Sequence, residues 1–357
     1  MLDRFFASLG VLRPRAIMQM RKSGENSRRD IQNLTEAITR LGEDIAALRT
    51  SIQEQNVEIA TVRMRESQLR AIAERNLESQ GCDGELEAVI GDPALESHVA
   101  RAIAESDLRL HPCPYTVVDD LLPEPFYAAL IEGLPPVELF ADRPVNSQQL
   151  NVPLHLAPDY SRRIWRFMAE TVVPHMLMPA VVAKFQAPLE EWTRTSFAIA
   201  DGDALNTMRL ATSDGRILLR TNGYDIPPHR DPKWGFLTCI FYLARRGDDK
   251  RWGTDLYEVD EDTEAVGAAP HWIENTPWRK VGSVKFKRNR ALIFLNSTGA
   301  HGASIPADAE PPMLQRYVYQ FRIGPDAASM AALIARLSPE RRVYWDGKLK
   351  DKRVPAM

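Results

Sequence analysis

The first pattern along the chain is an apolar repeat that begins at residue 31. Apolar residues follow one another at steps of three and four positions, and the series is Ile31, Leu34, Ile38, Leu41, Ile45, Leu48, Ile52, Ile59, Val62 and Leu69. The positions between them are polar or charged and no proline interrupts the run. This pattern predicts one long solvated helix with a narrow apolar seam.

The composition of the seam predicts self-association. Isoleucine at the a positions of a heptad and leucine at the d positions favour a parallel two-stranded coiled coil, so a dimer with a second copy of the chain is favoured. Gln55 at a d position and Glu66 at an a position weaken the register toward the end of the run. The alternative is a single helix that packs back on the rest of the chain.

Weaker signals follow the repeat. Residues 81 to 93 contain three glycines and a proline, which predicts a break, and a short helix is expected over residues 94 to 106. A short strand is expected from residue 112 and a helix from residues 123 to 125. Further helices are expected at about 159 to 175 and 178 to 192.

The second half of the chain alternates between apolar runs and clusters of Gly, Pro, Asn and Asp. We expect strands over residues 217–220, 236–243, 254–259, 281–287, 291–296 and 316–323. Many short strands imply a sandwich or barrel with helices packed outside it, so the expected fold class is mainly β with flanking helices (α+β). A last helix is expected over residues 327 to 337.

These elements divide the chain into four parts. The first, residues 1–80, holds an N-terminal segment and the coiled coil, and residues 81–111 form a linker with a bridging helix. Residues 112–325 form the strand-rich domain, and residues 326–357 form a C-terminal helix and a basic tail.

Composition narrows the class of protein. With 357 residues and 44% hydrophobic content the chain is globular, and its 45 basic and 48 acidic residues nearly cancel, so no nucleic-acid partner is expected. The three cysteines, Cys82, Cys113 and Cys239, lack metal or redox spacing, which favours a reducing cytoplasm. No secretory signal or membrane span is visible. Residues 1 to 12, followed by several arginines, are either an amphipathic segment in peripheral contact with a membrane or a frayed or docked helix.

Candidate chemistry lies at the ends of two expected strands. His229 and Asp231 stand two residues apart just before an apolar run, and at strand spacing their side chains face the same way. His301 follows another apolar run after a short polar turn. Two imidazoles and one carboxylate suit non-haem iron(II), because they occupy one face of the metal and leave positions open for substrate and oxygen.

A basic residue completes the pattern. Arg316 opens an expected strand in which Arg316, Val318, Gln320 and Arg322 share one face while Tyr317, Tyr319 and Phe321 share the other. A guanidinium inside a barrel needs an anion, which a dicarboxylic acid supplies.

In order and spacing these residues resemble the 2-oxoglutarate/Fe(II) dioxygenase superfamily, particularly its prolyl 4-hydroxylase-like branch. The pattern is His-x-Asp, a distal His, and then a basic residue. The flanks match as well, with Tyr224 before Pro228 and His229, Tyr242 in the next strand, and Gly302 after the distal histidine. The resemblance covers about residues 112 to 325.

The resemblance implies a double-stranded β-helix, or jelly roll of the cupin type, with His229, Asp231 and His301 as catalytic metal ligands. It implies that Arg316 binds 2-oxoglutarate, although Arg316 lies 15 residues after His301, farther than is usual in the family, so Arg322 remains the alternative. Tyr242 and Tyr224 are weaker candidates for the same pocket. Tyr242 is equally well explained as a core residue.

The implied cofactors are Fe(II), 2-oxoglutarate as co-substrate and O2, with ascorbate as a further candidate. The expected reaction is hydroxylation of an unactivated C–H bond in a small-molecule or glycan-type substrate, with release of succinate and CO2. A peptidyl-prolyl hydroxylase is the alternative within the same class. An oligomeric scaffold with a non-catalytic jelly roll is the alternative of another class, and the complete ligand set argues against it.

Overall fold

The computed structural model describes residues 14–197, 199, 205, 208–232, 234–259, 271–272, 277–339 and 342. The chain divides into two units, Met1–Glu66 and Ser67–Met357. The expected amphipathic segment at residues 1 to 12 and the basic tail lie outside the described residues. Among the described helices, none combines the length and the apolar character needed to cross a membrane.

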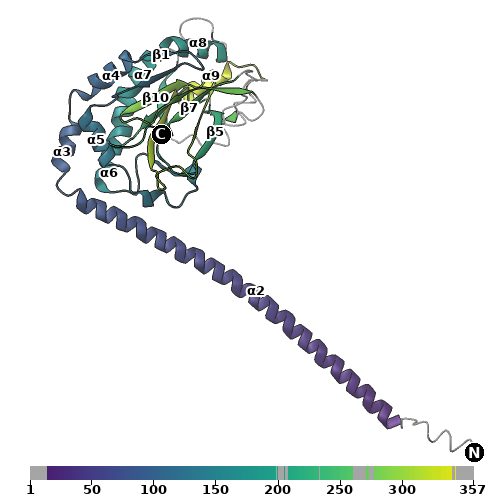
Figure 1. Ribbon diagram of the computed structural model, residues 1–357. Coiled ribbons are helices and arrows are strands. Elements are labelled where there is room, and N and C mark those ends of the chain that lie inside the picture. The colour runs from purple at the N-terminus through teal and green to yellow at the C-terminus, as the bar shows by residue number, and fades with distance from the viewer. Residues whose placement is uncertain are drawn as a thin grey trace, which may run out of the picture. The chain divides into compact units, whose positions relative to one another are not determined.

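The predicted long helix is confirmed as α2 (Pro14–Glu78), which is 65 residues long and is coloured purple to blue in Figure 1. The ten apolar residues of the seam lie on this helix, and their exposed fractions range from 45% for Ile45 to 68% for Ile38. An apolar seam along a long helix is typical of a helix that pairs with a partner through that seam.

The second unit contains shorter helices as well as the strands described below. Their bounds are α3 Asp83–Ile90, α4 Leu95–Glu105, α5 Glu124–Glu132, α6 Asp159–Phe167, α7 Met178–Lys184, α8 Gln186–Phe197 and α9 Ala327–Ala335, with 3-10 turns η1 Val137–Phe140 and η2 Val145–Ser147. The prediction of a break over residues 81 to 93 is wrong for most of that segment, because α3 occupies it. Leu86 on α3 is fully buried, and this packing outweighs the glycine at position 84.

The helix expected over residues 159 to 175 is present but irregular. After α6 the chain continues as the π-helix η3 (Met168–Leu177), which contains Pro174. Proline has no backbone N–H and clashes with the carbonyl four residues before it, so a widened turn accommodates it within the helix.

The strands of the described residues form two antiparallel sheets. The seven-stranded sheet has the order β1-β2-β10-β6-β12-β4-β3, and the five-stranded sheet has the order β8-β5-β11-β7-β9. The bounds in the first are β1 Leu108–Arg109, β2 Tyr115–Val118, β3 Gln149–Asn151, β4 Leu210–Arg220, β6 Leu237–Tyr242, β10 Arg290–Leu295 and β12 Arg316–Pro325. Those in the second are β5 Asp225–Arg230, β7 Thr254–Val259, β8 His271–Trp272, β9 Trp278–Val284 and β11 Ala300–Ser304.

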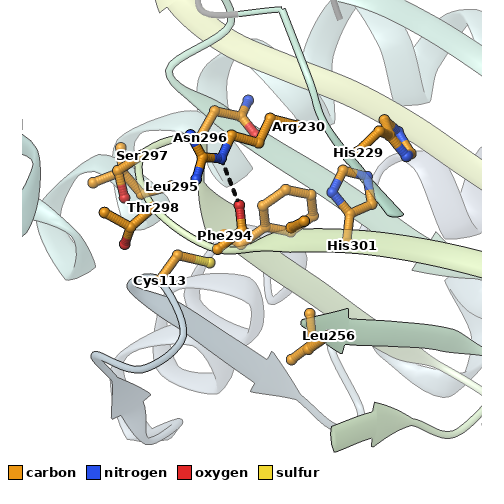
Figure 2. A pocket seen from close by; sticks show the side chains of 12 residues that line it. Cys113, His229, Arg230, Leu256, Phe294, Leu295, Asn296, Ser297, Thr298 and His301 are labelled. Carbon is orange, nitrogen blue, oxygen red and sulfur yellow. Dashed lines mark hydrogen bonds between the residues drawn. The ribbon is translucent and has the colours of Figure 1, made fainter. Parts of the chain in front are cut away.

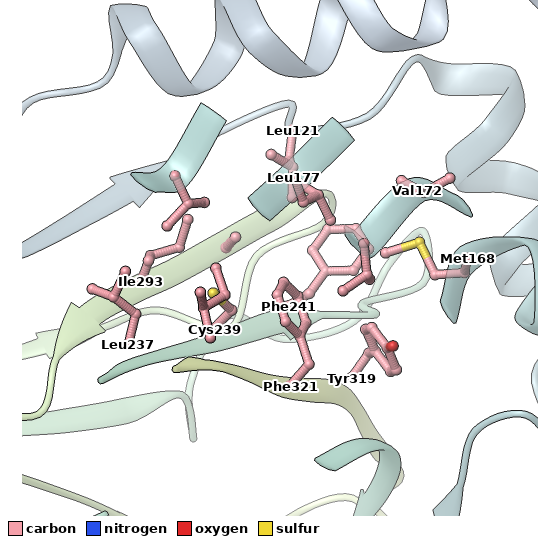
Figure 3. Close-up of a cluster of buried hydrophobic side chains, with 14 of the residues drawn as sticks. Leu121, Met168, Val172, Leu177, Leu237, Cys239, Phe241, Ile293, Tyr319 and Phe321 are labelled. Atoms are coloured by element: carbon pink, nitrogen blue, oxygen red, sulfur yellow. The ribbon is translucent and has the colours of Figure 1, made fainter. Parts of the chain in front are cut away.

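The two faces of the seven-stranded sheet carry different residues. On β12, Tyr317, Tyr319 and Phe321 join the large apolar core that includes the helices, whose residues Met168 and Val172 lie beside them in Figure 3. The helices of the second unit therefore cover this outer face, as Figure 1 shows.

The opposite face of β12, called the inner face below, turns toward the five-stranded sheet. Val318 lies in a second apolar cluster with Tyr242 from β6, Leu256 from β7 and Val284 from β9. The predicted assignment of the two faces of β12 is thus confirmed, and it directs Arg316, Gln320 and Arg322 into the space between the sheets.

Candidate active site

Neighbouring strands bring the two histidines together. His229 lies near the end of β5 and pairs directly with His301 at the start of β11, and Asp231 follows β5 immediately. Successive β-strand residues alternate between faces, so Arg230 points away from the histidines and donates to the carbonyl of Gly299 at 2.9 Å.

The three side chains form a compact donor cluster. One ligand atom from each of His229, Asp231 and His301 lies within 4.8 Å of the others, and all three residues are buried. Asp231 Oδ1 is 3.8 Å from His229 Nε2, and its Oδ2 is 3.7 Å from His301 Nε2. Figure 2 shows the two imidazole rings side by side. Two imidazoles and a carboxylate in this arrangement fit a single divalent metal ion.

Contacts with the backbone and with an aromatic ring orient the imidazoles. The Nδ1 atom of His229 lies 2.9 Å from the carbonyl oxygen of Pro227, which accepts from it, so the electron pair of the neutral ring lies on Nε2. The ring of His301 lies 4.3 Å from that of His229 and 4.5 Å from that of Phe294, measured between centroids.

Two donors hold the carboxylate. Thr238 Oγ1 donates to Asp231 Oδ2 at 2.7 Å, and Arg322 Nη2 donates to Asp231 Oδ1, also at 2.7 Å. Asn296 Nδ2 in turn donates to Thr238 Oγ1 at 2.9 Å. Each carboxylate oxygen has further lone pairs, so these bonds fix the orientation of Asp231 without blocking metal binding.

The protonation states suit metal binding. Burial on its own raises the pKa of Asp231, but the charges of Arg322, His301 and His229 outweigh it and hold the pKa well below the usual range. Burial, and then the neighbouring His229, lower the pKa of His301 to about 3. At neutral pH the site therefore presents an ionised carboxylate and an electron pair on His301, which a metal ion requires.

The two arginines predicted from the sequence have different surroundings. Arg322 is bound to Asp231 in the metal cluster. Arg316 is 1% exposed, its guanidinium lies 4.6 Å from the centre of the Phe286 ring, and its Nη1 is 3.8 Å from Asp248 Oδ2. The Nε and Nη2 atoms of Arg316 have no hydrogen-bond partner among the described residues.

The two tyrosines predicted for the pocket lie in different surroundings. Tyr242 is fully buried on the inner face, packs edge-on against Phe286, and its hydroxyl has no hydrogen-bond partner among the residues described. Burial raises its pKa to about 12, against smaller opposing effects from Thr254 and Arg220. Tyr224 lies in a separate small apolar cluster, and the guanidinium of Arg220 lies 5.2 Å from the centre of its ring.

Sequence reasoning missed three polar residues of the site. Thr238 and Asn296 hold Asp231 through a chain of hydrogen bonds, and Arg220 is buried at the end of β4, directly opposite Arg316 in the register. Thr238 stands with Tyr242 among the flanking residues that resemble the family and shares its strand face, but neither observation predicts the hydrogen bond to Asp231. Arg220 and Asn296 each follow an apolar run, where a polar residue usually marks the surface. Their burial results from the pairing of strands that are distant in sequence, which the local pattern does not reveal.

A pocket opens beside the donor cluster. It is lined by His229, His301 and Phe294 and continues along the turn that carries Asn296, Ser297 and Thr298. Figure 2 shows this turn next to Arg230 and Cys113. The hydroxyl of Ser297 is buried without a hydrogen-bond partner among the described residues, so this turn offers polar groups to a bound molecule.

Comparisons with known proteins give distant likenesses. No family model matches the chain, and neither does any curated protein. HygX from Streptomyces hygroscopicus, solved with nickel and 2-oxoglutarate bound, is 11% identical, with 60% of this chain and 83% of that one covered and a TM-score of 0.36. A Pseudomonas putida prolyl-4-hydroxylase is 12% identical over 64% and 98% of the two chains, with a TM-score of 0.32.

A third neighbour is SnoN, a non-heme alpha ketoglutarate dependent epimerase from nogalamycin biosynthesis. It is 15% identical over 68% of this chain and 89% of its own, with a TM-score of 0.32. At these TM-scores the function of the chain has to be argued from its own residues.

Proposed function

We propose that the chain is an Fe(II)- and 2-oxoglutarate-dependent oxygenase. The observation that carries the proposal is the buried cluster of His229, Asp231 and His301, whose donor atoms lie within 4.8 Å of one another. A carboxylate and two imidazoles leave half of an octahedral metal ion open, which suits a co-substrate and oxygen better than a closed structural zinc site.

The chain's own residues prepare the metal site. Pro227 fixes the orientation of His229, and Thr238 and Arg322 fix that of Asp231. Burial excludes bulk water from these groups and keeps His301 neutral. When bound, Fe(II), 2-oxoglutarate and O2 together supply the oxidation that places one oxygen atom in a substrate C–H bond and the other in succinate, with release of CO2.

The inner face of the seven-stranded sheet supplies a basic site for the distal carboxylate of 2-oxoglutarate. Of the two arginines predicted from the sequence, Arg322 is bound to Asp231, so only Arg316 remains a candidate part of this site. Arg316 is buried and has unpartnered nitrogen atoms. Arg220 lies opposite it on the same rung of the sheet.

The arrangement of strands supports a jelly roll as the catalytic domain. Two antiparallel sheets face each other. The chain alternates between them from β4 to β7 and again from β9 to β12, while β7, β8 and β9 all lie in the smaller sheet. The donor cluster lies at strand ends, where loops are free to vary with the substrate.

The substrate is proposed to be a small molecule or glycan rich in hydroxyl groups. The turn beside the donor cluster includes Ser297, whose hydroxyl has no hydrogen-bond partner among the described residues and suits a hydrogen bond to such a molecule. A peptidyl-prolyl hydroxylase remains the alternative. A panel of sugars, glycosides and proline-containing peptides, read out by succinate release above the uncoupled rate, separates the two.

The direct test is anaerobic reconstitution of the protein with Fe(II) and 2-oxoglutarate. A weak visible charge-transfer band is expected in the wild type and no band in Asp231→Ala. A folded, metal-loaded wild type without the band would favour the scaffold alternative.

Self-association through α2 is proposed as the second property of the chain. In a parallel in-register pair, g and e positions meet across the interface, so Asp44 would face Arg49 of the second copy and Glu58 would face its Arg63. An antiparallel pair would set these arginines against each other. Arg65 at a g position would face Arg70 at an e position of the second copy, and the two would repel each other. This pair lies where Glu66 already weakens the seam.

The proposed location is the cytoplasm, with peripheral membrane contact through the N-terminal segment as an open option. The three cysteines are free, and Cys113 and Cys239 are buried with pKa values raised by burial, Cys113 to about 12. Such thiols are inert rather than redox-active.

A further inference from the structure

Arg220 is a buried cation that lies over the Tyr224 ring but forms no ion pair with a described residue. It is 6% exposed, and none of the described carboxylates lies within ion-pair distance of it. Its Nη1 makes one long contact, 3.5 Å, with the carbonyl oxygen of Gly253, and its Nε has no partner among the described residues. A buried guanidinium in these surroundings needs an anion.

The position of Arg220 relative to the donor cluster fits a short dicarboxylic acid. Its contact, Gly253, precedes Thr254 on β7, and Thr254 lies two residues before Leu256, which pairs with His301. At about 3.3 Å per residue, Thr254 is about 7 Å along the strand from the level of His301. A five-carbon diacid bound at the metal by its keto-acid end extends over a comparable distance.

Two buried hydroxyls accompany Arg220. The hydroxyls of Tyr242 and Thr254 lie close to each other, and neither has another hydrogen-bond partner among the described residues. Tyr242 pairs with Val318 on β12, and Arg220 pairs with Arg316 two residues earlier on that strand. A guanidinium and two hydroxyls are the donors that a buried carboxylate requires.

Arg316 differs from Arg220 in having a carboxylate of its own. Its Nη1 is 3.8 Å from Asp248, and the neighbouring charges that act on it are those of Asp248, Asp249, Arg251 and Arg245, all on the segment between β6 and β7. Arg316 is thus partly neutralised by that segment.

We infer that Arg220, together with the hydroxyls of Tyr242 and Thr254, directly binds the distal carboxylate of 2-oxoglutarate. Arg316 does not bind that carboxylate and instead pairs with Asp248. This inference rests on the proposed function and names the residue that selects the co-substrate. It also moves the main contact from β12, where the sequence predicted it, to the end of β4.

The test compares two keto acids that bind the metal in the same way. Pyruvate has the keto-acid end of 2-oxoglutarate but lacks the distal carboxylate. The full-length protein is loaded anaerobically with Fe(II), and the charge-transfer band is titrated with each acid in wild type, Arg220→Gln, Arg220→Lys and Arg316→Gln. Arg288→Gln, which removes a surface arginine bound to Glu124, is the matched control.

In Arg220→Gln the concentration of 2-oxoglutarate at half-saturation should rise about 10- to 100-fold, as expected for the loss of hydrogen bonds between charged groups. Pyruvate binding should stay unchanged, so the preference for 2-oxoglutarate over pyruvate collapses. Arg220→Lys should recover part of the preference, and Arg316→Gln should reduce it less than Arg220→Gln does. The pyruvate titration also verifies that each variant keeps a folded metal site.

An Arg220→Gln protein with the wild-type preference for 2-oxoglutarate would overturn the assignment while leaving the proposed function intact. The same holds if Arg316→Gln alone abolishes the preference. If metal-loaded wild type gives a band with neither acid, the proposed function fails and this inference fails with it.

Discussion

Arg322 and the carboxylate of Asp231 form a buried ion pair, 2.7 Å from Nη2 to Oδ1, in which the arginine is 4% and the aspartate 5% exposed. The pair joins β12 of the larger sheet to the end of β5 in the smaller one. An arginine that we considered as an anchor for the co-substrate therefore serves a metal ligand instead.

Loss of Arg322 should destabilise the metal-free protein. Arg322→Met leaves Asp231 buried without its cation, which typically costs about 3 to 5 kcal/mol of unfolding free energy. A divalent metal replaces the missing positive charge, so nickel(II) should raise the melting temperature more in this variant than in the wild type. Arg322→Lys, which keeps the charge, is the control, and equal stabilisation of wild type and Arg322→Met would contradict the role given to the pair.

The same pair predicts a change in acid stability. The pKa of Asp231 in the folded protein lies below its ordinary value of 3.8. The contribution of Asp231 to the free energy of unfolding is therefore fully present above pH 3.8 and is lost as the pH falls through the folded-state pKa. In Arg322→Met the folded-state pKa rises, so loss of stability on acidification should begin at higher pH. Chemical denaturation of the metal-free proteins between pH 7 and pH 4 measures this, and parallel curves would count against it.

Gly235 offers a way to move Arg322 without removing it. A Cβ atom at residue 235 would lie 2.4 Å from Cδ of Arg322, so Gly235→Ala should push the side chain away from Asp231. Because the displaced guanidinium no longer neutralises Asp231, a divalent metal should bind more tightly than in the wild type, in agreement with the larger metal stabilisation expected for Arg322→Met. Competition with a chromophoric chelator gives the affinity. Gly282→Ala, where a Cβ would meet nothing within 4 Å, should bind metal as the wild type does.

Metal binding should itself stabilise the fold. Removal of metal by a chelator lowers the melting temperature, and metal at about 100 times its dissociation constant contributes about 2.7 kcal/mol. His301→Ala should abolish this response because one of the three donors is lost, whereas His98→Ala, an exposed histidine outside the cluster, should retain it. A full metal response in His301→Ala would remove the histidine from the site.

The sequence predicted those features that depend on short-range patterns. The heptads give α2, the alternation along β12 gives its two faces, and His229 with Asp231 and the later His301 give the three residues of the donor cluster. The features it missed depend on which strands pair. Arg220 becomes an inner-face residue only because β4 pairs with β12, and α3 forms because Leu86 finds a place in the core.

The orientation of α2 pairs can be tested by charge reversal. Glu58→Lys alone sets a lysine against Arg63 of the second copy in a parallel dimer, twice by symmetry, and should weaken the dimer several-fold at low salt, since exposed pairs contribute about 0.2 to 1 kcal/mol each. Adding Arg63→Glu to the same chain restores two opposite-charge pairs in the parallel arrangement, so the double variant should dimerise as the wild type does. In an antiparallel dimer g meets g and e meets e, so residue 58 does not face Arg63, and the loss in the single variant followed by recovery in the double variant is not expected.

Ile45→Lys serves as the disruptive control, because it places a charge at an a position of the seam and should give a monomer. Sedimentation equilibrium of the full-length proteins reports the mass of each. A monomeric wild type at micromolar concentration would mean that the exposed seam of α2 binds another partner, and that the catalytic domain works as a single copy.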